Sequence, residues 1–146
     1  MDVNEQIASL YEKDTKLGYA NLQALEALSA QEATLYPYTK EFIAMLKSDK
    51  YVVRVRGFRL LCLQAKCDSE GIIDGAINEI LTALNDEKPT AVRQMLQYLG
   101  YLAPYKKPLH PAIRRAVLSI DLSRFKDTMM PLIEKDIGAL LKELEA

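Results

Sequence analysis

The chain of 146 residues contains no tryptophan, one histidine and only two cysteines. One histidine cannot form a cluster of imidazole zinc ligands, and two thiols cannot supply the four of an iron–sulfur cluster. No apolar run reaches the roughly 18 residues that predict a membrane-spanning helix. Lysine plus arginine (19) almost balances aspartate plus glutamate (20), so the formal net charge is −1. That balance argues against a dedicated nucleic-acid-binding protein, because such proteins usually carry a basic excess.

The two cysteines and the N-terminus bear on the compartment. Cys62 and Cys67 lie five residues apart, which places them about 140° apart around a single helix and disfavours a disulfide between them. The first five residues, M-D-V-N-E, lack the basic and apolar regions of a signal peptide. We therefore expect free thiols and a cytoplasmic protein.

The residues that usually carry catalysis are scarce or badly placed. His110 stands between Leu109 and Pro111, a setting typical of a helix start or a loop. The sequence has no G-x-S-x-G segment and no glycine-rich phosphate loop. We expect several carboxylates to lie on solvent-facing sides of helices: Asp74, Glu79, Glu134 and Asp136. These observations predict a protein that is not an enzyme and binds no metal or cofactor.

Apolar residues recur at helical spacing, and no alternation typical of β-strands persists. The expected helices cover about 3–12, a segment after the capping pair Asp14-Thr15, a segment from Pro37, and then about 51–66, 70–84, 89–103, 111–120 and 130–144. The segment 51–66 is apolar on almost all sides, which predicts a central helix covered by several neighbours. The longer polar stretch 121–128 has room for a turn of 3₁₀ helix.

Short connections make sequential helices antiparallel neighbours. The eight segments therefore pair into four helical hairpins, at about 1–30, 36–66, 70–104 and 108–146. No linker or low-complexity segment divides the chain. We expect one all-α domain spanning residues 1–146.

One short pattern occurs twice. Asp49 is followed seven residues later by Arg56, and Asp86 is followed seven residues later by Arg93. Valine precedes the arginine in both copies, and the offset between the copies is 37 residues. A fixed offset of this size predicts a stack of similar helical units, a class of protein that presents a surface.

The pattern resembles that of HEAT repeats in their short bacterial form. The resemblance rests on the Asp…Val-Arg segments and on the apolar runs that follow them, 58–63 and 95–102. It implies a HEAT- or armadillo-like α-solenoid, an α-α superhelix of about four antiparallel hairpins. It also implies a polar ladder between neighbouring repeats, formed by Asp49, Arg56, Asp86 and Arg93. Asn21 and Thr128 stand where the first and last hairpins would need the arginine, as in terminal capping repeats.

In HEAT stacks the second helix of each pair lines the concave side. The resemblance therefore implies a shallow binding groove along the second, fourth and sixth expected helices. Its candidate residues are Tyr19, Gln23, Glu26, Arg56, Leu60, Gln64, Arg93, Gln94, Gln97 and Tyr101. Tyrosine and arginine are favoured at interfaces, and amides form hydrogen bonds without the desolvation cost of a charge.

Charge is distributed in blocks. Residues 50–66 carry basic side chains only, 68–87 carry acidic side chains only, and 104–126 are again mainly basic. Either the basic and acidic helices lie side by side and neutralise one another, or a basic strip contacts an acidic partner or a phosphate backbone.

These observations favour a scaffold or protein–protein interaction module without chemistry of its own. One alternative is a HEAT-like protein that contacts nucleic acid through Arg54, Arg56, Arg59 and Arg93. A second alternative is a HEAT-like lyase or accessory factor, which would need a bilin-like ligand and a convergent pair of acids. The sequence does not name the partner.

Overall fold

A computed structural model describes residues 2–12 and 15–145, apart from the side chain of Thr15, and this part of the chain forms helices and the turns that join them, with no β-strand. The α-helices are α1 (Val3–Ser9), α2 (Thr15–Gln31), α3 (Thr39–Ala44), α4 (Tyr51–Leu63), α5 (Ile72–Gly75), α6 (Ile77–Thr82), α7 (Pro89–Leu102), α8 (His110–Leu118) and α9 (Met130–Glu145). Turns of 3₁₀ helix are η1 (Tyr36–Tyr38), η2 (Met45–Lys47), η3 (Ala65–Cys67), η4 (Ala83–Asn85), η5 (Ala103–Tyr105), η6 (Lys107–Leu109) and η7 (Leu122–Arg124). The capping role expected of Asp14-Thr15 falls outside the described residues.

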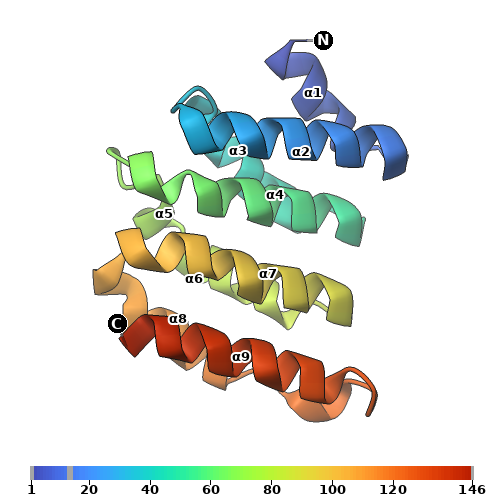
Figure 1. Cartoon of the computed structure of the whole chain (residues 1–146), viewed down its shortest axis with the longest axis vertical. Coiled ribbons are helices and arrows are strands. Elements are labelled where there is room, and N and C mark those ends of the chain that lie inside the picture. Colours follow the sequence, from blue (N-terminus) through green and yellow to red (C-terminus); the bar gives the residue numbers. More distant parts are fainter. Residues whose placement is uncertain (1, 13–14, 146) are drawn as a thin grey trace.

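The helices form two layers (Figure 1). A front layer contains α2, α4, α7 and α9, which follow one another along the long axis in chain order and run in the same direction. A rear layer contains α3, α5, α6 and α8, and α1 lies at the N-terminal end beside α2. Because the front helices are parallel, all their N-termini lie at one edge of the layer.

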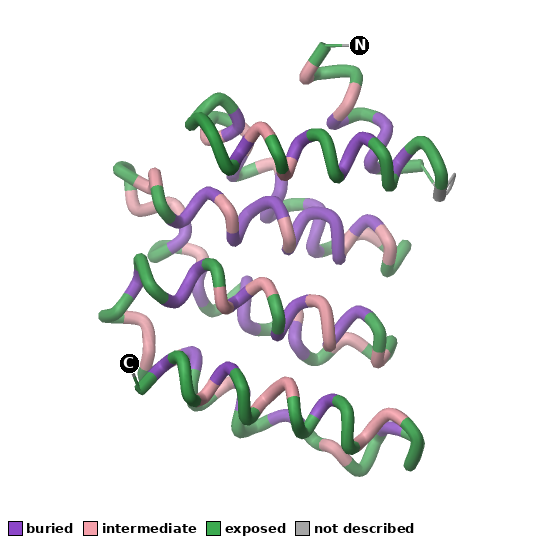
Figure 2. The backbone as a smooth tube through the Cα atoms, in the orientation of Figure 1, coloured by how far each residue is buried: buried purple, intermediate pink, exposed green. Residues whose placement is uncertain are grey.

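The core lies between and within the layers, and α4 is its centre (Figure 2). Its fully buried side chains include Phe58, Leu60 and Leu61, and it contacts α2, α3 and α7. The prediction of a central helix covered on several sides is confirmed. α7 and α9 instead bury one apolar stripe each. α9 is the last front helix, so its charged side faces solvent.

One predicted helix is wrong. The segment expected as a single helix over 70–84 is broken into α5, α6 and η4. The break lies at Ala76, whose φ of −109° and ψ of 12° leave the helical region. Gly75 precedes it. Glycine loses more conformational entropy in a helix than other residues do, so the helix is weak at this point and the chain can bend. Gly71, the N-cap residue just before α5, has a φ of 66°, a left-handed conformation that suits glycine.

The predicted polar ladder has different partners from those expected. Arg54, not Arg56, forms the ion pair with Asp86 (2.7 Å), and Arg93 pairs with Asp136 of α9 (2.7 Å). Asp49 is exposed, with no ion pair among the described residues. Asp49 lies in the bend before α4. Arg56 lies within α4 and donates to the backbone carbonyl groups of Leu10 and Glu12 instead of to a carboxylate.

The block pattern of charge is confirmed as intramolecular at two positions. Arg54 of the basic segment 50–66 pairs with Asp86, and Lys106 of the basic segment 104–126 pairs with Asp68 and Asp74. Both join a basic segment to the acidic segment 68–87, and Lys47, just before the first basic segment, pairs with Glu79 of the same acidic segment. Arg124 completes the contact of the last basic segment with this region by donating to the carbonyl groups of Leu84 and Asn85.

Replacing Arg93 with alanine should lower the free energy of unfolding by only about 1 kcal/mol, because this ion pair is partly solvated. The side chains of Arg93 and Asp136 are 39% and 22% exposed. Urea unfolding followed by circular dichroism measures the change. Arg115→Ala, on an exposed face of α8, is the control and should change stability by less than about 0.5 kcal/mol. A loss above about 3 kcal/mol for Arg93→Ala would mean that the pair is buried.

Candidate functional site

The front layer separates the expected binding residues into buried and exposed groups. Arg56, Leu60 and Gln64 are buried, with exposed fractions of 4%, 0% and 1%. The expectation that Leu60 and Gln64 line a surface is wrong, because this side of α4 packs against α2, and Arg56 reaches only the wall of a hollow. Gln64, for example, donates to Ser29 of α2 at 3.1 Å. A helix apolar on nearly all sides gives no sequence signal to show which stripe remains free.

The other expected residues reach the surface. Tyr19, Gln23, Gln97 and Tyr101 are exposed, whereas Glu26, Arg93 and Gln94 are half-buried. Tyr19 and Tyr101 keep 52% and 53% of their surface exposed. The structure thus brings together residues of α2 and α7 on one layer, with α4 between them.

Arg59 joins the three helices, and the sequence pointed to it only under the nucleic-acid alternative, not as part of the groove. Its guanidinium donates to both carboxylate oxygens of Glu26 (3.0 and 2.7 Å) and to Oε1 of Gln94 (2.9 Å). It also lies over the ring of Tyr98, 4.7 Å from the centroid, and the rings of Tyr98 and Tyr101 are 5.2 Å apart. A bidentate arginine with a stacked ring holds its partners in fixed geometry. We call these residues, Glu26, Arg59, Gln94 and Tyr98, the Arg59 cluster.

The protonation states within the Arg59 cluster follow from its environment. Burial alone would lower the pKa of Arg59, but the Glu26 carboxylate outweighs burial and raises it. Burial raises the pKa of Tyr98 well above its usual range, and the same carboxylate adds to this effect. Both shifts keep Arg59 protonated and Tyr98 neutral near neutral pH, so neither side chain is placed to exchange a proton there.

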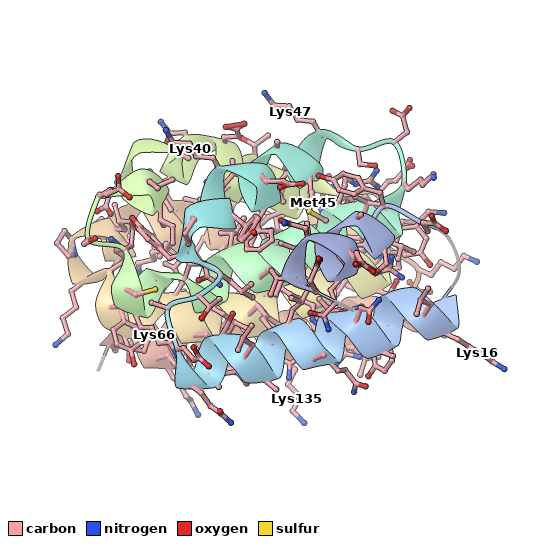
Figure 3. All side chains as sticks on the ribbon, turned by 90° about the horizontal axis from the view of Figure 1, so that it is seen from above. Lys16, Lys40, Met45, Lys47, Lys66 and Lys135 are labelled. Atoms are coloured by element: carbon pink, nitrogen blue, oxygen red, sulfur yellow. The ribbon has the colours of Figure 1, made fainter. Side chains whose placement is uncertain are left out.

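A hollow of about 570 Å³ opens beside the Arg59 cluster. It lies between the first turns of three front helices, and we call it the α2–α4–α7 hollow. The residues that line it are Lys16, Tyr19, Leu22, Tyr51, Val52, Val55, Arg56, Arg59, Thr90 and Gln94. Figure 3 shows Lys16 at the end of α2, while Lys40 and Lys47 project from the opposite, rear side.

Arg56 forms part of the wall of this hollow and binds backbone rather than a carboxylate. Its Nη1 donates to the carbonyl oxygens of Leu10 and Glu12, both at 2.9 Å. A Cβ on Gly18 would lie 2.5 Å from Nη2 of Arg56, so glycine is needed where the guanidinium crosses α2. Asn21, at the position aligned with the arginine of later repeats, is buried and donates to Ser9 at 2.7 Å.

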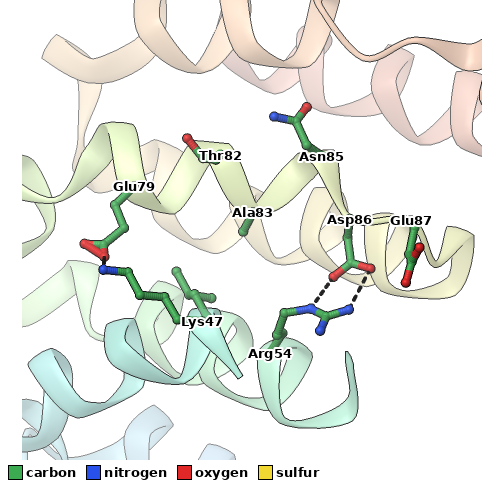
Figure 4. Close-up of a pocket in the computed structure, with 9 residues that line it drawn as sticks. Lys47, Arg54, Glu79, Thr82, Ala83, Asn85, Asp86 and Glu87 are labelled. Atoms are coloured by element: carbon green, nitrogen blue, oxygen red, sulfur yellow. Dashed lines mark hydrogen bonds and ion pairs between the residues drawn. The ribbon is translucent and has the colours of Figure 1, made fainter. Parts of the chain in front are cut away.

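A second hollow, of about 550 Å³, lies between η2, α4, α6 and η4, and we call it the α6 hollow (Figure 4). Lys47 pairs with Glu79 at one end (3.3 Å), and Arg54 pairs with Asp86 at the other. Each cation of the wall thus has a carboxylate partner, and Glu87 adds a third carboxylate. The described wall of the α6 hollow therefore offers no excess of positive charge.

Other kinds of site find little support in the described part of the chain. It contains no group of three or more histidine, cysteine, aspartate or glutamate side chains placed to hold a metal ion. Over residues 2–12 and 15–145, no helix combines the length and apolar character needed to cross a bilayer. Cys62 and Cys67 are free thiols, as predicted, and His110 begins α8 with Nε2 2.7 Å from the carbonyl oxygen of Ala103.

The chain matches no protein-family model, no curated protein and no solved structure.

Proposed function

We propose that the protein is a HEAT-like α-solenoid whose front layer recognises a protein partner. The observation that carries this proposal is the concentration of exposed tyrosine and amide side chains on one layer of parallel helices. Tyr19, Gln23, Gln97 and Tyr101 project from α2 and α7. Tyrosine supplies large contact area at a low cost in side-chain entropy, which is why it is enriched at interfaces.

The Arg59 cluster supports the proposal because it makes the surface rigid before binding. Its contacts link α2, α4 and α7 across the layer. A preformed surface loses less conformational entropy on association. The regular stacking of rear and front helices in Figure 1 supports the solenoid part of the proposal, since stacked hairpins build their core from nearest neighbours.

Recognition of a nucleic acid is the less favoured function. Three arginines of the expected basic strip are paired with carboxylates: Arg54 with Asp86, Arg59 with Glu26, and Arg93 with Asp136. A phosphate backbone would have to displace these carboxylates. Binding a duplex requires a track of available cations, and its strength falls steeply with salt.

Replacing Tyr101 with alanine should weaken binding of the partner about tenfold, as expected for loss of a central interface tyrosine. The partner is first captured from lysate on the immobilised chain and identified by mass spectrometry. The dissociation constant of the purified pair is then measured by calorimetry. Tyr105→Ala is the matched control, because Tyr105 is similarly exposed (58% against 53%) but lies in η5, beyond the end of α7. Equal effects of the two variants, or tight binding that neither changes, would contradict the proposal.

A further inference from the structure

The α2–α4–α7 hollow has an excess of positive charge. Three cations line it, Lys16, Arg56 and Arg59, and no aspartate or glutamate of residues 2–12 and 15–145 belongs to its lining. Glu26 neutralises Arg59, but Arg56 has no carboxylate partner among the described residues, and only two backbone carbonyl groups accept from it. This distinguishes the hollow from the α6 hollow, where both cations have carboxylate partners.

Arg56 is only 4% exposed, yet part of its guanidinium remains available. Guanidinium carries five N–H groups, and both hydrogen bonds that Arg56 donates use Nη1. No fully enclosed side-chain nitrogen in residues 2–12 and 15–145 lacks a hydrogen-bond partner. The nitrogens of Arg56 without an acceptor are therefore not fully enclosed, and Arg56 belongs to the lining of the hollow. Burial lowers the pKa of Arg56 without a carboxylate to offset it, so an arriving anion would relieve a desolvated charge.

The start of α4, one of the helix starts around the hollow, adds to its positive potential. Tyr51 and Val52 belong to the first turn of α4, and Thr90 belongs to the first turn of α7. The N-cap residues of these helices are Lys50 and Lys88, whose side chains cap neither helix. The backbone N–H of Lys50 donates to Oγ of Ser48 (3.2 Å), and that of Lys88 donates to a carboxylate oxygen of Asp86 (3.0 Å). Asp86 thus offsets the positive end of the α7 dipole, whereas the start of α4 is held by a neutral hydroxyl.

Apart from Thr90 and Gln94, the rest of the described wall is aliphatic or aromatic and indicates what accompanies the anion. Leu22, Val52 and Val55 form an aliphatic surface, flanked by the rings of Tyr19 and Tyr51. This surface fits an aliphatic side chain next to a carboxylate. A phosphate backbone would find two of the arginines of this layer already paired with carboxylates, Arg59 with Glu26 and Arg93 with Asp136.

We propose that the α2–α4–α7 hollow binds an acidic linear peptide of the protein partner. One aspartate or glutamate carboxylate of the peptide meets Arg56, and a neighbouring aliphatic side chain packs against Leu22, Val52 and Val55. The inference rests on the proposed function and adds the chemistry of the partner. It also gives the hollow a role separate from that of Tyr101, at the other end of α7.

The test is a titration of the ¹⁵N-labelled full chain followed by NMR. The probe is an acetylated, amidated hexapeptide that alternates aspartate and leucine, and its counterpart carries asparagine for each aspartate. We expect saturable shifts of the amides of Tyr51, Val52, Val55 and Thr90 with the acidic peptide and none with the counterpart. The shifts should weaken at high salt, because salt screens the partly exposed charges. Equal binding of both peptides, or no shifts at these amides, would overturn the proposal.

Val52→Glu places a carboxylate at the mouth of the hollow without removing a contact of Arg56. It should weaken binding of the acidic peptide about tenfold, since like charges repel and a carboxylate on α4 competes for Arg56. Val52→Gln, of the same shape but neutral, should bind nearly as the natural chain does. Equal affinities of the two variants would overturn the assignment of the peptide carboxylate to Arg56.

Two further measurements, a titration with DNA and the binding of the captured partner to the variants, separate this inference from the proposed function. A short DNA duplex that shifts the same amides at lower concentration than the acidic peptide would replace the peptide with a nucleic acid. If the captured partner is sensitive to Tyr101→Ala but binds Val52→Glu and Val52→Gln equally well, the front layer binds a protein and the hollow is not its peptide site. If Val52→Glu alone weakens the partner, the inference holds and the role of Tyr101 fails.

Discussion

Replacing Asp68 with alanine is expected to lower the free energy of unfolding by about 3 kcal/mol, because it leaves a buried cation and three other donors with fewer acceptors. The side chain of Asp68 is completely buried. It accepts from Tyr36 Oη (2.6 Å) and from the backbone N–H groups of Ile72 and Ile73 (2.9 and 3.0 Å). It also pairs with Lys106 Nζ at 2.9 Å.

The loss is large because Asp68 joins three successive hairpins. Tyr36 comes from the second, α5 begins the third, and Lys106 leads into the fourth. Lys106 keeps its ion pair with Asp74 after the change, which limits the cost. Urea unfolding measures the effect, and Asp74→Ala is the control, since the side chain of Asp74 is 44% exposed and should cost about 1 kcal/mol or less. Similar losses for the two variants would show that Asp68 has no special role.

The same carboxylate should make the protein less stable in acid. Burial alone would raise the pKa of Asp68, but hydrogen bonds from Tyr36, Lys106, Ile73 and Ile72 outweigh it and lower the pKa. A folded-state pKa below the unfolded value of about 4 gives stability that is present at neutral pH and is lost as pH falls below about 4. Asp68→Asn should therefore narrow the stability difference between pH 7 and pH 3, whereas Asp74→Asn should change it less.

The helices could be predicted from the sequence because each buries a stripe at helical spacing. The stripes of α7 and α9, and the 3₁₀ turn within 121–128, lie where periodicity and turn residues place them. The break at Ala76 could not be predicted in this way. Isoleucines at 73, 77 and 80 keep the helical spacing across it, so the apolar pattern is the same whether the backbone bends or continues.

The binding face was harder to predict because it depends on which neighbours cover a helix. Tyr19, Gln97 and Tyr101 were correctly expected at the surface, since they oppose clear apolar stripes. On α4, Arg56 and Gln64 look solvent-facing by residue type but are buried, because each finds polar partners in the first hairpin. Long side chains also contact partners about 33 residues away in the sequence, as Arg59 does with Glu26. A local motif cannot predict such a contact; only the spacing between successive repeats indicates it.

Gly57→Ala is expected to lower the free energy of unfolding by about 2–3 kcal/mol, although alanine is the better helix former. Gly57 lies inside α4, where the helix crosses α3 and η2. A Cβ at this position would lie 2.6 Å from the carbonyl oxygen of Phe42 and 2.6 Å from Cβ of Met45. Phe42 and Met45 are themselves buried, so neither group can withdraw into solvent. The two helices would have to separate at the centre of the core.

Gly138→Ala is the matched control and should have the opposite sign. Gly138 also lies inside a long helix, α9, but an added Cβ there would meet no atom within 4 Å. Alanine should therefore raise the free energy of unfolding by about 0.5–1 kcal/mol through helix propensity alone. Urea unfolding of both variants, followed by circular dichroism at 222 nm, measures the pair in one experiment. Equal gains would mean that α4 and α3 do not approach as closely as this packing requires. A loss confined to Gly57→Ala would establish that a glycine at this crossing, rather than in helices generally, lets α4 occupy the centre of the stack.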